Sequence, residues 1–162
     1  DEIERAWQLH RRTFLQRGNE PYLNLEAFRQ IAATMGEALQ FTFACLGDEI
    51  VAVAVFFVGK DTLYGRYWGS AEEYHSLHFE TCYHQGIEFC IERGLQRFEP
   101  GTQGEHKVSR GFAPTFTWSA HRIVEPRFRA AIADYLAREK IGVEQYAAGI
   151  AEHVPYKQEL AP

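Results

Sequence analysis

The chain has 162 residues, of which 46% are hydrophobic and 14% aromatic, and 17 lysines and arginines face 22 acidic residues for a net charge of −5. This length predicts one domain with a substantial core, and the negative charge excludes a dedicated duplex-DNA binder. The longest apolar run, 50–58, is about half the ~20 residues of a membrane-spanning helix, so no transmembrane segment is expected.

Three cysteines without a CxxC pair are typical of a reducing compartment, and with no signal peptide in view we expect a cytoplasmic protein. The chain begins at Asp1 rather than at a methionine and enters a helical pattern at once. We therefore expect a fragment of a longer protein.

The first half of the sequence predicts two helices and three strands. Apolar residues at three- and four-residue steps predict a helix over 2–16, inside an N-terminal helical segment 1–19, and a second over 25–35 that Asn24 caps and Gly36 ends. Alternating and β-branched runs then predict strands over 40–46, 49–58 and 62–68, joined by tight turns. These strands form an antiparallel meander, and the second, apolar on both faces, should be central.

The second half begins with the strongest helical pattern, 77–93, followed by a short strand over 95–99. Strand, helix and strand make a β-α-β crossover, so the strands at 62–68 and 95–99 should be parallel. A further strand is predicted over 115–123, then helices over 127–140 and 143–153 and a loose tail over 155–162. The whole chain thus predicts a single α/β domain, 1–162, with a mixed β-sheet flanked by helices.

The segment 98–114 contains three glycines, two prolines and charges of both signs between a helix and a strand. Glycines such as Gly101, Gly104 and Gly111 allow the backbone to approach a ligand closely, and the prolines stop a ladder or a helix. This loop leaves the end of the strand at 95–99, where an α/β sheet commonly opens into a cleft. We interpret it as a binding or catalytic loop, and the alternative is a solvated connection.

Lys107 is the first catalytic candidate, because its ammonium can stabilise an oxyanion or bind phosphate oxygens. Glu99 and Glu105 could hold that ammonium, or one of them could act as the base for an incoming amine. Arg110 could bind a phosphate or carboxylate, and the alternative is a clamp on a loop carbonyl. For the lysine and the glutamates, the alternative is a solvated surface with salt bridges.

Seven histidines invite a metal hypothesis, yet no HExxH or CxxC spacing occurs, so no metal site is predicted. Tyr67 and Trp68 belong to an aromatic strand that could line a pocket for a sugar, peptide or base, or could simply be core. GxSxG, P-loop and GxGxxG motifs are also missing from the sequence, so nucleoside triphosphate chemistry and a Rossmann cofactor are not expected.

The order of the predicted elements is similar to the GNAT acyltransferase fold. Three stretches, 64–69, 77–83 and 98–107, together with Arg110-Gly111-Phe112, resemble the Fem-like GNAT group of peptidoglycan biosynthesis or recognition proteins over about residues 20–155. Full members have two GNAT-like domains, and this chain resembles the C-terminal one.

This resemblance implies transfer of an acyl or aminoacyl group to an amine acceptor, such as a peptidoglycan precursor. Lys107 stands where a lysine that polarises the donor carbonyl is expected, and Gln103, His106, Arg110 and the loop glycines would bind substrate together with Tyr67 and Trp68. Acyl-CoA or aminoacyl-tRNA would be the donor, with no resident cofactor. Residues 69–76 lack the phosphate-binding turn of coenzyme A-dependent members. The alternative is a non-catalytic module that recognises a cell-wall precursor.

Overall fold

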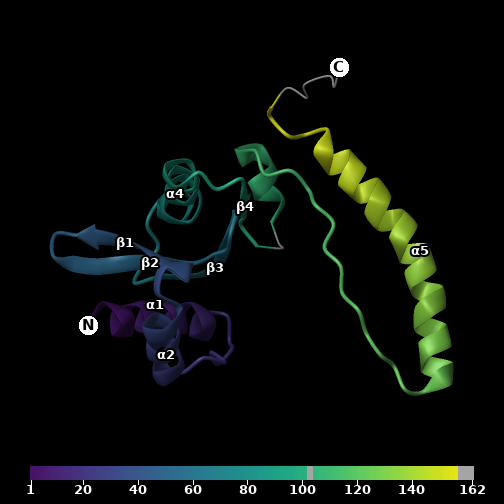
Figure 1. Cartoon of the computed structure of the whole chain (residues 1–162), viewed down its shortest axis with the longest axis horizontal. Helices are drawn as coiled ribbons and strands as arrows, with labels where there is room; N and C mark the ends of the chain where they lie inside the picture. The colour runs from purple at the N-terminus through teal and green to yellow at the C-terminus, as the bar shows by residue number, and fades with distance from the viewer. Residues whose placement is uncertain (102–103, 157–162) are drawn as a thin grey trace. The chain divides into compact units, whose positions relative to one another are not determined.

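A computed structural model describes residues 1–101 and 104–156, and these residues group into two compact units, Asp1–Thr102 and Gln103–Pro162. The first unit is a mixed four-stranded sheet of order β1-β2-β3-β4 with helices on both faces (Figure 1). Its strands are β1 (Leu39–Leu46), β2 (Glu49–Val58), β3 (Thr62–Ser70) and β4 (Arg97–Glu99). The predicted α/β fold of GNAT type is confirmed.

Strand β2 is central because its side chains are apolar on both faces. Residues 51–56 are all buried, and β2 pairs antiparallel with β1 on one side and with β3 on the other. The turn before it uses Gly47 at φ +60°, a left-handed conformation that glycine adopts without strain. The predicted meander is therefore confirmed.

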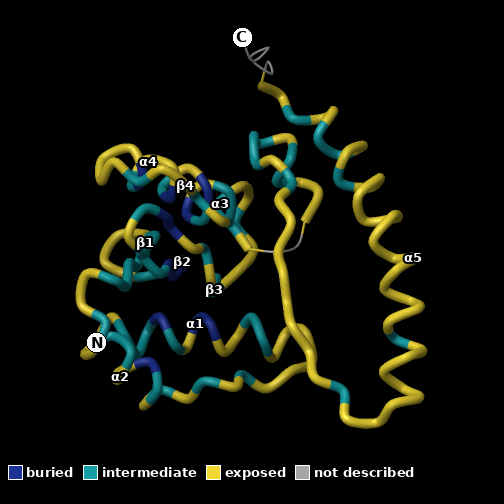
Figure 2. The backbone as a smooth tube through the Cα atoms, turned by 45° about the vertical axis from the view of Figure 1, so that its right-hand side comes forward, coloured by how far each residue is buried: buried dark blue, intermediate teal, exposed yellow. Residues whose placement is uncertain are grey.

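One face of the sheet is covered by α1 (Glu2–Gln16) and α2 (Leu25–Met35) (Figure 1). Asp1 caps α1, and the Asn24 side chain accepts the Ala27 N–H at 2.9 Å as the predicted cap of α2. The core of this layer joins α1 to β2 through four buried residues: Ala6, Leu9, Val53 and Val55. Figure 2 shows the buried side of α1 as alternating dark segments.

The other face is covered by the crossover helix, whose last part is α4 (Gln85–Arg93). Its core consists of four buried residues, Ala54, Phe56, Leu63 and Cys90. The connection brings β4 beside β3 in parallel, as predicted, and Arg97 fixes the start of β4 by donating to both carboxylate oxygens of Asp61, at 3.0 and 2.9 Å. Hydrogen bonds from Thr62 and Arg97 lower the pKa of the Asp61 carboxyl.

The crossover helix is not the regular 77–93 helix that the periodicity predicts. It begins with α3 (Leu77–Phe79), continues as a π-helix over Glu80–His84, and becomes α4 only at Gln85. The apolar stripe indicated a helix correctly, but a pattern of side chains does not report a local change from i→i−4 to i→i−5 hydrogen bonding.

The second unit contains a 3₁₀-helix, Glu105–Arg110, and the long helix α5, Pro126–Ala151. The strand predicted over 115–123 is wrong: those residues have no regular structure, and all eight residues of 115–122 are exposed. Alternation alone cannot make a strand where no partner strand supplies hydrogen bonds. The two helices predicted over 127–140 and 143–153 are one helix, because a single glycine, Gly142, costs a helix interior only about 1 kcal/mol.

Candidate functional site

The candidate site in the first unit lies where β4 leaves β3. The two strands pair only through Thr62 with Arg97, Leu63 with Phe98 and Tyr64 with Glu99, whereas β3 continues to Ser70. In the part of the chain that the structure describes, no strand pairs with that edge of β3 beyond Tyr64. Along this edge the backbone N–H and C=O groups of β3 are not engaged by a described strand.

Gly65 marks the point of separation. A Cβ atom on Gly65 would lie 3.3 Å from the Cα of Pro100 and 3.5 Å from the carbonyl oxygen of Glu99. The chain that follows β4 thus passes directly against the β3 backbone, and a side chain here would push it away. Pro100 lacks an N–H and cannot extend the ladder, so the parallel pairing ends at this residue.

The start of the crossover helix lies on the side of the sheet to which the Trp68 side chain points. The His78 ring lies 5.3 Å from the rings of both Trp68 and Tyr83, and 5.4 Å from the Phe79 ring, centroid to centroid. Ser76, which precedes the helix, has φ +60°, the one non-glycine residue with positive φ among those described. Such strain is maintained only where surrounding structure requires it, and it gathers at functional sites.

The π-helix is the feature of this site that the sequence did not reveal. Within it, Thr81 and Tyr83 are buried, and the Thr81 hydroxyl donates to the Leu77 carbonyl at 2.7 Å. Single π-turns inside α-helices occur frequently at functional sites.

Tyr67 and Trp68, predicted together as substrate-binding residues, point to opposite faces of β3. Tyr67 packs against α1 and α2, where its hydroxyl accepts the hydrogen bond of the Tyr22 hydroxyl at 2.9 Å. Burial and that bond raise the pKa of Tyr67 to about 12. Of the two, only Trp68 therefore lies on the face of the crossover helix.

Polar side chains on the π-helix and α4 hydrogen-bond one another. Glu80 meets the Nδ1 of His84 at 2.9 Å and accepts the Gln85 amide at 3.0 Å, and Gln85 also donates to Glu88 at 3.1 Å. The bonds from Gln85 and His84 lower the pKa of the Glu80 carboxyl. Among the described residues, no group of three histidines, cysteines or carboxylates is arranged to hold a metal ion.

In the second unit the predicted loop folds into a 3₁₀-turn that presents Lys107. Gly104 at φ +112° precedes it and Gly111 at φ +90° ends it, so both glycines occupy backbone conformations that other residues rarely adopt. Lys107 is half-buried. The turn was predicted as an irregular loop, and its local i→i+3 bonds give the lysine a defined backbone position.

Arg110 serves the turn as a clamp. Its Nη1 donates to the His106 carbonyl at 2.6 Å, and the Ser109 hydroxyl donates to the same carbonyl at 2.9 Å. This contact is the clamp on a loop carbonyl that the sequence analysis gave as the alternative to ligand binding by Arg110. It holds the backbone on both sides of Lys107.

Glu105 also has a partner inside the second unit. Its carboxylate accepts the phenol of Tyr146 from α5, and this bond raises the pKa of Tyr146. At the end of the turn, a Cβ on Gly111 would overlap the Tyr156 ring, so a side chain at this positive-φ position would displace that ring. These two contacts join the 3₁₀-turn to α5 and to the segment that follows it.

The predicted site residues are divided between the units. Glu99 ends β4 and is exposed, and Gly101 follows it at φ +94°, both in the first unit. Glu105, His106, Lys107, Arg110 and Gly111 share one turn of the second unit. Gln103 lies outside the described residues, as does the predicted tail from residue 157 onward.

Comparison with known proteins assigns the chain to a family. The model of the FemAB-like family, described as peptidoglycan biosynthesis/recognition, matches residues 1–158. The chain belongs to the FemAB-like family. This confirms the resemblance read from the sequence, and it extends the match to α1.

Other comparisons of this FemAB-like chain are sparse. No curated protein matches it. Among solved structures, a tetramutant of the BH1408 protein from Bacillus halodurans is similar at 18% identity and a TM-score of 0.47, over 75% of this chain and 92% of that one. In the described part of the chain, no helix is long and apolar enough to cross a bilayer.

Proposed function

We propose that this FemAB-like chain transfers an acyl or aminoacyl group to an amine, with a peptidoglycan precursor as the class of acceptor. The observation that carries the proposal is the edge of β3 beyond Tyr64, with which no described strand pairs, next to a crossover helix that contains a π-helical segment. An extended peptide-like substrate can hydrogen-bond to such a strand edge. The peptidoglycan description of the family supports this class of acceptor.

Lys107 takes the role of oxyanion stabiliser in this proposal. The amine nitrogen attacks the donor carbonyl carbon, the C=O bond opens to an oxyanion, and the lysine ammonium stabilises that charge. Collapse of the intermediate breaks the bond to the leaving thiol or hydroxyl. The amine proton passes to a carboxylate and then to the leaving group.

Glu99 is the carboxylate assigned to accept that proton. Glu105 already accepts the Tyr146 phenol, so its role is to hold the turn that carries Lys107. Glu99 is exposed at the end of β4, where the pairing of β4 with β3 ends. The donor is an acyl-CoA or an aminoacyl-tRNA, and the shared chemistry is an activated ester or thioester.

The second candidate is a module that recognises a cell-wall precursor without catalysis. It is supported by the word recognition in the family description and by the use of Arg110 as a loop clamp instead of a ligand contact. Such a module would bind the muramyl peptide but leave it unchanged.

Thermal denaturation with candidate ligands tests both, because a ligand that binds only the folded state raises the midpoint. We would compare acetyl-CoA, longer acyl-CoAs, CoA alone, an aminoacyl-tRNA mimic and a muramyl peptide. The enzyme proposal expects a rise with one donor and with the muramyl peptide. A rise with the muramyl peptide alone favours the recognition module, and no rise with any of them argues against both.

Lys107→Ala tests the catalytic assignment. Loss of the ammonium should lower the transfer rate at least about tenfold, by removing charge stabilisation of the intermediate, with the same circular dichroism spectrum and midpoint. Lys60→Ala, at an exposed position of the β2–β3 turn, is the matched control and should keep full activity. A loss below tenfold in the folded Lys107 variant would sink the assigned role.

A further inference from the structure

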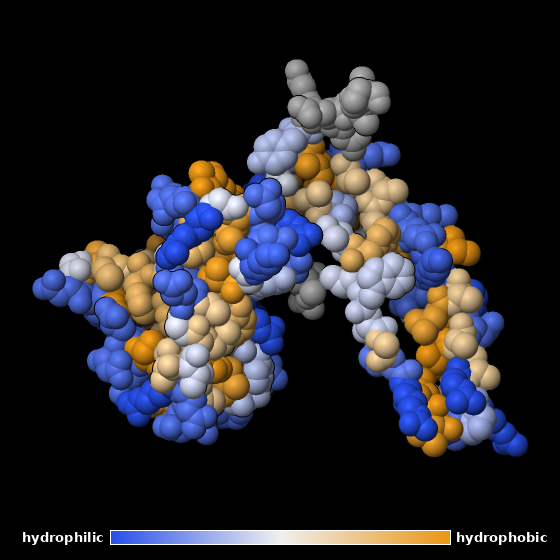
Figure 3. Space-filling view, viewed as in Figure 1, coloured by the Kyte–Doolittle hydropathy of each residue, from blue (hydrophilic) through white to orange (hydrophobic). Residues whose placement is uncertain are grey.

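Helix α5 carries an apolar stripe that the described residues leave uncovered. None of the residues of α5 is buried, yet apolar side chains recur along it at three- and four-residue steps. These define the α5 stripe: Phe128, Ile132, Tyr135, Leu136, Val143, Tyr146 and Ile150. Figure 3 shows hydrophobic residues along α5 among hydrophilic ones. Exposed fractions of 62% for Phe128 and 51% for Leu136 mark a contiguous surface that favours association.

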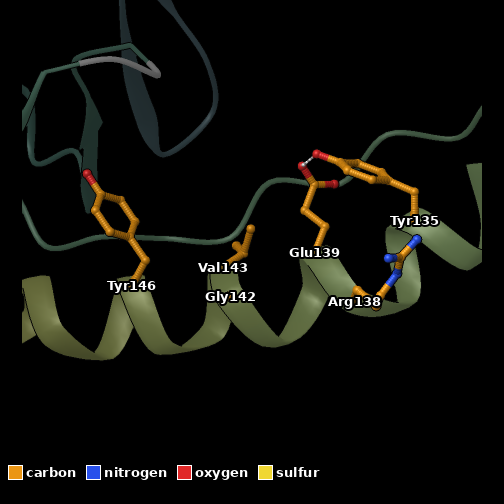
Figure 4. A pocket seen from close by; sticks show the side chains of 6 residues that line it. All are labelled: Tyr135, Arg138, Glu139, Gly142, Val143 and Tyr146. Carbon is orange, nitrogen blue, oxygen red and sulfur yellow. Dashed lines mark hydrogen bonds between the residues drawn. The ribbon is translucent and has the colours of Figure 1, made fainter.

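A hollow lies in the middle of this stripe. It has a volume of about 440 Å³ and is lined by residues of α5 alone: Tyr135, Arg138, Glu139, Gly142, Val143 and Tyr146. Figure 4 shows the two tyrosines rising on either side of Gly142, with Glu139 accepting the Tyr135 hydroxyl at 3.0 Å. Nothing lies within 4 Å of where a Cβ on Gly142 or Gly149 would be. Two helix-interior glycines that no other described residue approaches are suited to the close approach of another helix.

The charges of α5 identify the kind of helix that fits. Residues 126–140 carry four arginines and lysines against two acids, whereas residues 141–153 carry two glutamates and no lysine or arginine. A helix of the same sequence running in the opposite direction would place its acidic half beside the basic half. Existing ion pairs, Arg138 with Asp134 and Lys140 with Glu144, are exposed and can rearrange at little cost.

We propose that α5 pairs antiparallel with α5 of a second copy of this chain. In the antiparallel register, Tyr135 meets Tyr146, Glu139 meets Gly142, and Ile132 meets Gly149 of the other copy, so large side chains enter the gaps at the glycines. Glu139 keeps its hydrogen bond from Tyr135. A parallel pair would instead set basic half against basic half and glycine against glycine.

Sedimentation of the full chain with matched variants tests the pairing. Leu136→Glu places a carboxylate in the stripe and should weaken the dimer at least about tenfold, because a charge is buried without a partner. Ala137→Glu makes the same change of charge one residue on, on the opposite side of α5, and should leave the dimer intact. A monomer at about 100 µM, far above the Kd of a stable pair, or equal loss in both variants, overturns the proposal.

Disulfide trapping tests the direction of the helices. The Leu136→Cys and Val143→Cys proteins are made in a Cys45→Ser background, which removes the exposed native cysteine. Each protein is oxidised alone, and an equimolar mixture of the two is oxidised under the same conditions. Antiparallel pairing predicts that the mixed 136–143 disulfide forms much faster than 136–136 or 143–143. Dominant homodisulfides would mean a parallel pair and overturn the antiparallel arrangement.

Discussion

At the scale of single residues, His10 is the most constrained titratable group of the first unit. It is 1% exposed, and its ring lies 4.7 Å from Phe14, 4.6 Å from Tyr67 and 5.2 Å from Phe28. Its Nε2 has no hydrogen-bond partner among the described residues. Burial, and then the positive charge of Arg66, lower the pKa of His10 to about 4.

This lowered pKa predicts acid sensitivity. In the unfolded chain the His10 imidazole takes up a proton near its ordinary pKa of 6.5, whereas in the folded chain it takes up that proton only near pH 4. Stability should therefore be full above about pH 6.5 and fall by on the order of 3 kcal/mol as the pH drops to 4. Urea unfolding at several pH values measures this, and His10→Leu should flatten the profile. An unchanged pH dependence in the variant would contradict the assignment to His10.

At the scale of elements, the contact between α1 and β3 depends on Gly69. A Cβ on this residue would overlap the carbonyl carbon of Leu9 and lie 2.5 Å from the amide nitrogen of His10. Both atoms belong to the α1 backbone, so a side chain at position 69 can be accommodated only if the whole helix moves. The missing side chain of Gly69 therefore sets the distance between the helix and the sheet.

Gly69→Ala should lower the free energy of unfolding by more than about 2 kcal/mol, since overpacking against backbone cannot relax. Gly86→Ala is the comparison, because its Cβ would meet the Phe98 ring at 2.7 Å, a side chain with more freedom to adjust. We expect the smaller loss there. Urea denaturation of both variants measures the two losses in the free energy of unfolding. A larger loss for Gly86→Ala than for Gly69→Ala would contradict a tight contact between α1 and β3 at Gly69.

At the scale of the whole molecule, the two units differ in what holds them together. Every buried residue among those described lies between Ala6 and Cys90, in the first unit, whereas residues 104–156 contain none. Burial of apolar surface is the dominant favourable contribution to folding. The first unit therefore holds its own core, and the stability of the second depends on what covers α5.

Fragments test this difference. A fragment of residues 1–101 should unfold cooperatively in urea, because it retains both halves of the core on the two faces of β2. A fragment of residues 104–162 should show weak, non-cooperative helical signal at low concentration, rising with concentration if α5 pairs with itself. Non-cooperative unfolding of the first fragment would contradict the assignment of the core.

The sequence by itself determined the elements whose signals are local. Periodicity placed α1 and α2 closely, Asn24 and Gly36 marked the ends of α2, and the Gly47 turn with the β-branched run at 49–58 predicted the hairpin and its central strand. The motifs around Lys107 and the crossover helix also sufficed to indicate the family. Local hydrogen bonding and turn chemistry act within a few residues, so the sequence records them directly.

Only the tertiary structure decided the features that depend on distant partners. Residues 115–123 alternate like a strand, but no described strand pairs with them. Tyr67 packs against α1, whereas Trp68 packs against the crossover helix on the other face of the sheet. The π-helix and the end of the β3–β4 pairing at Tyr64 are likewise seen only in the folded chain. Strand pairing and burial bring together residues that are far apart along the chain. A local sequence pattern carries no information about whether a distant partner strand or packing surface exists.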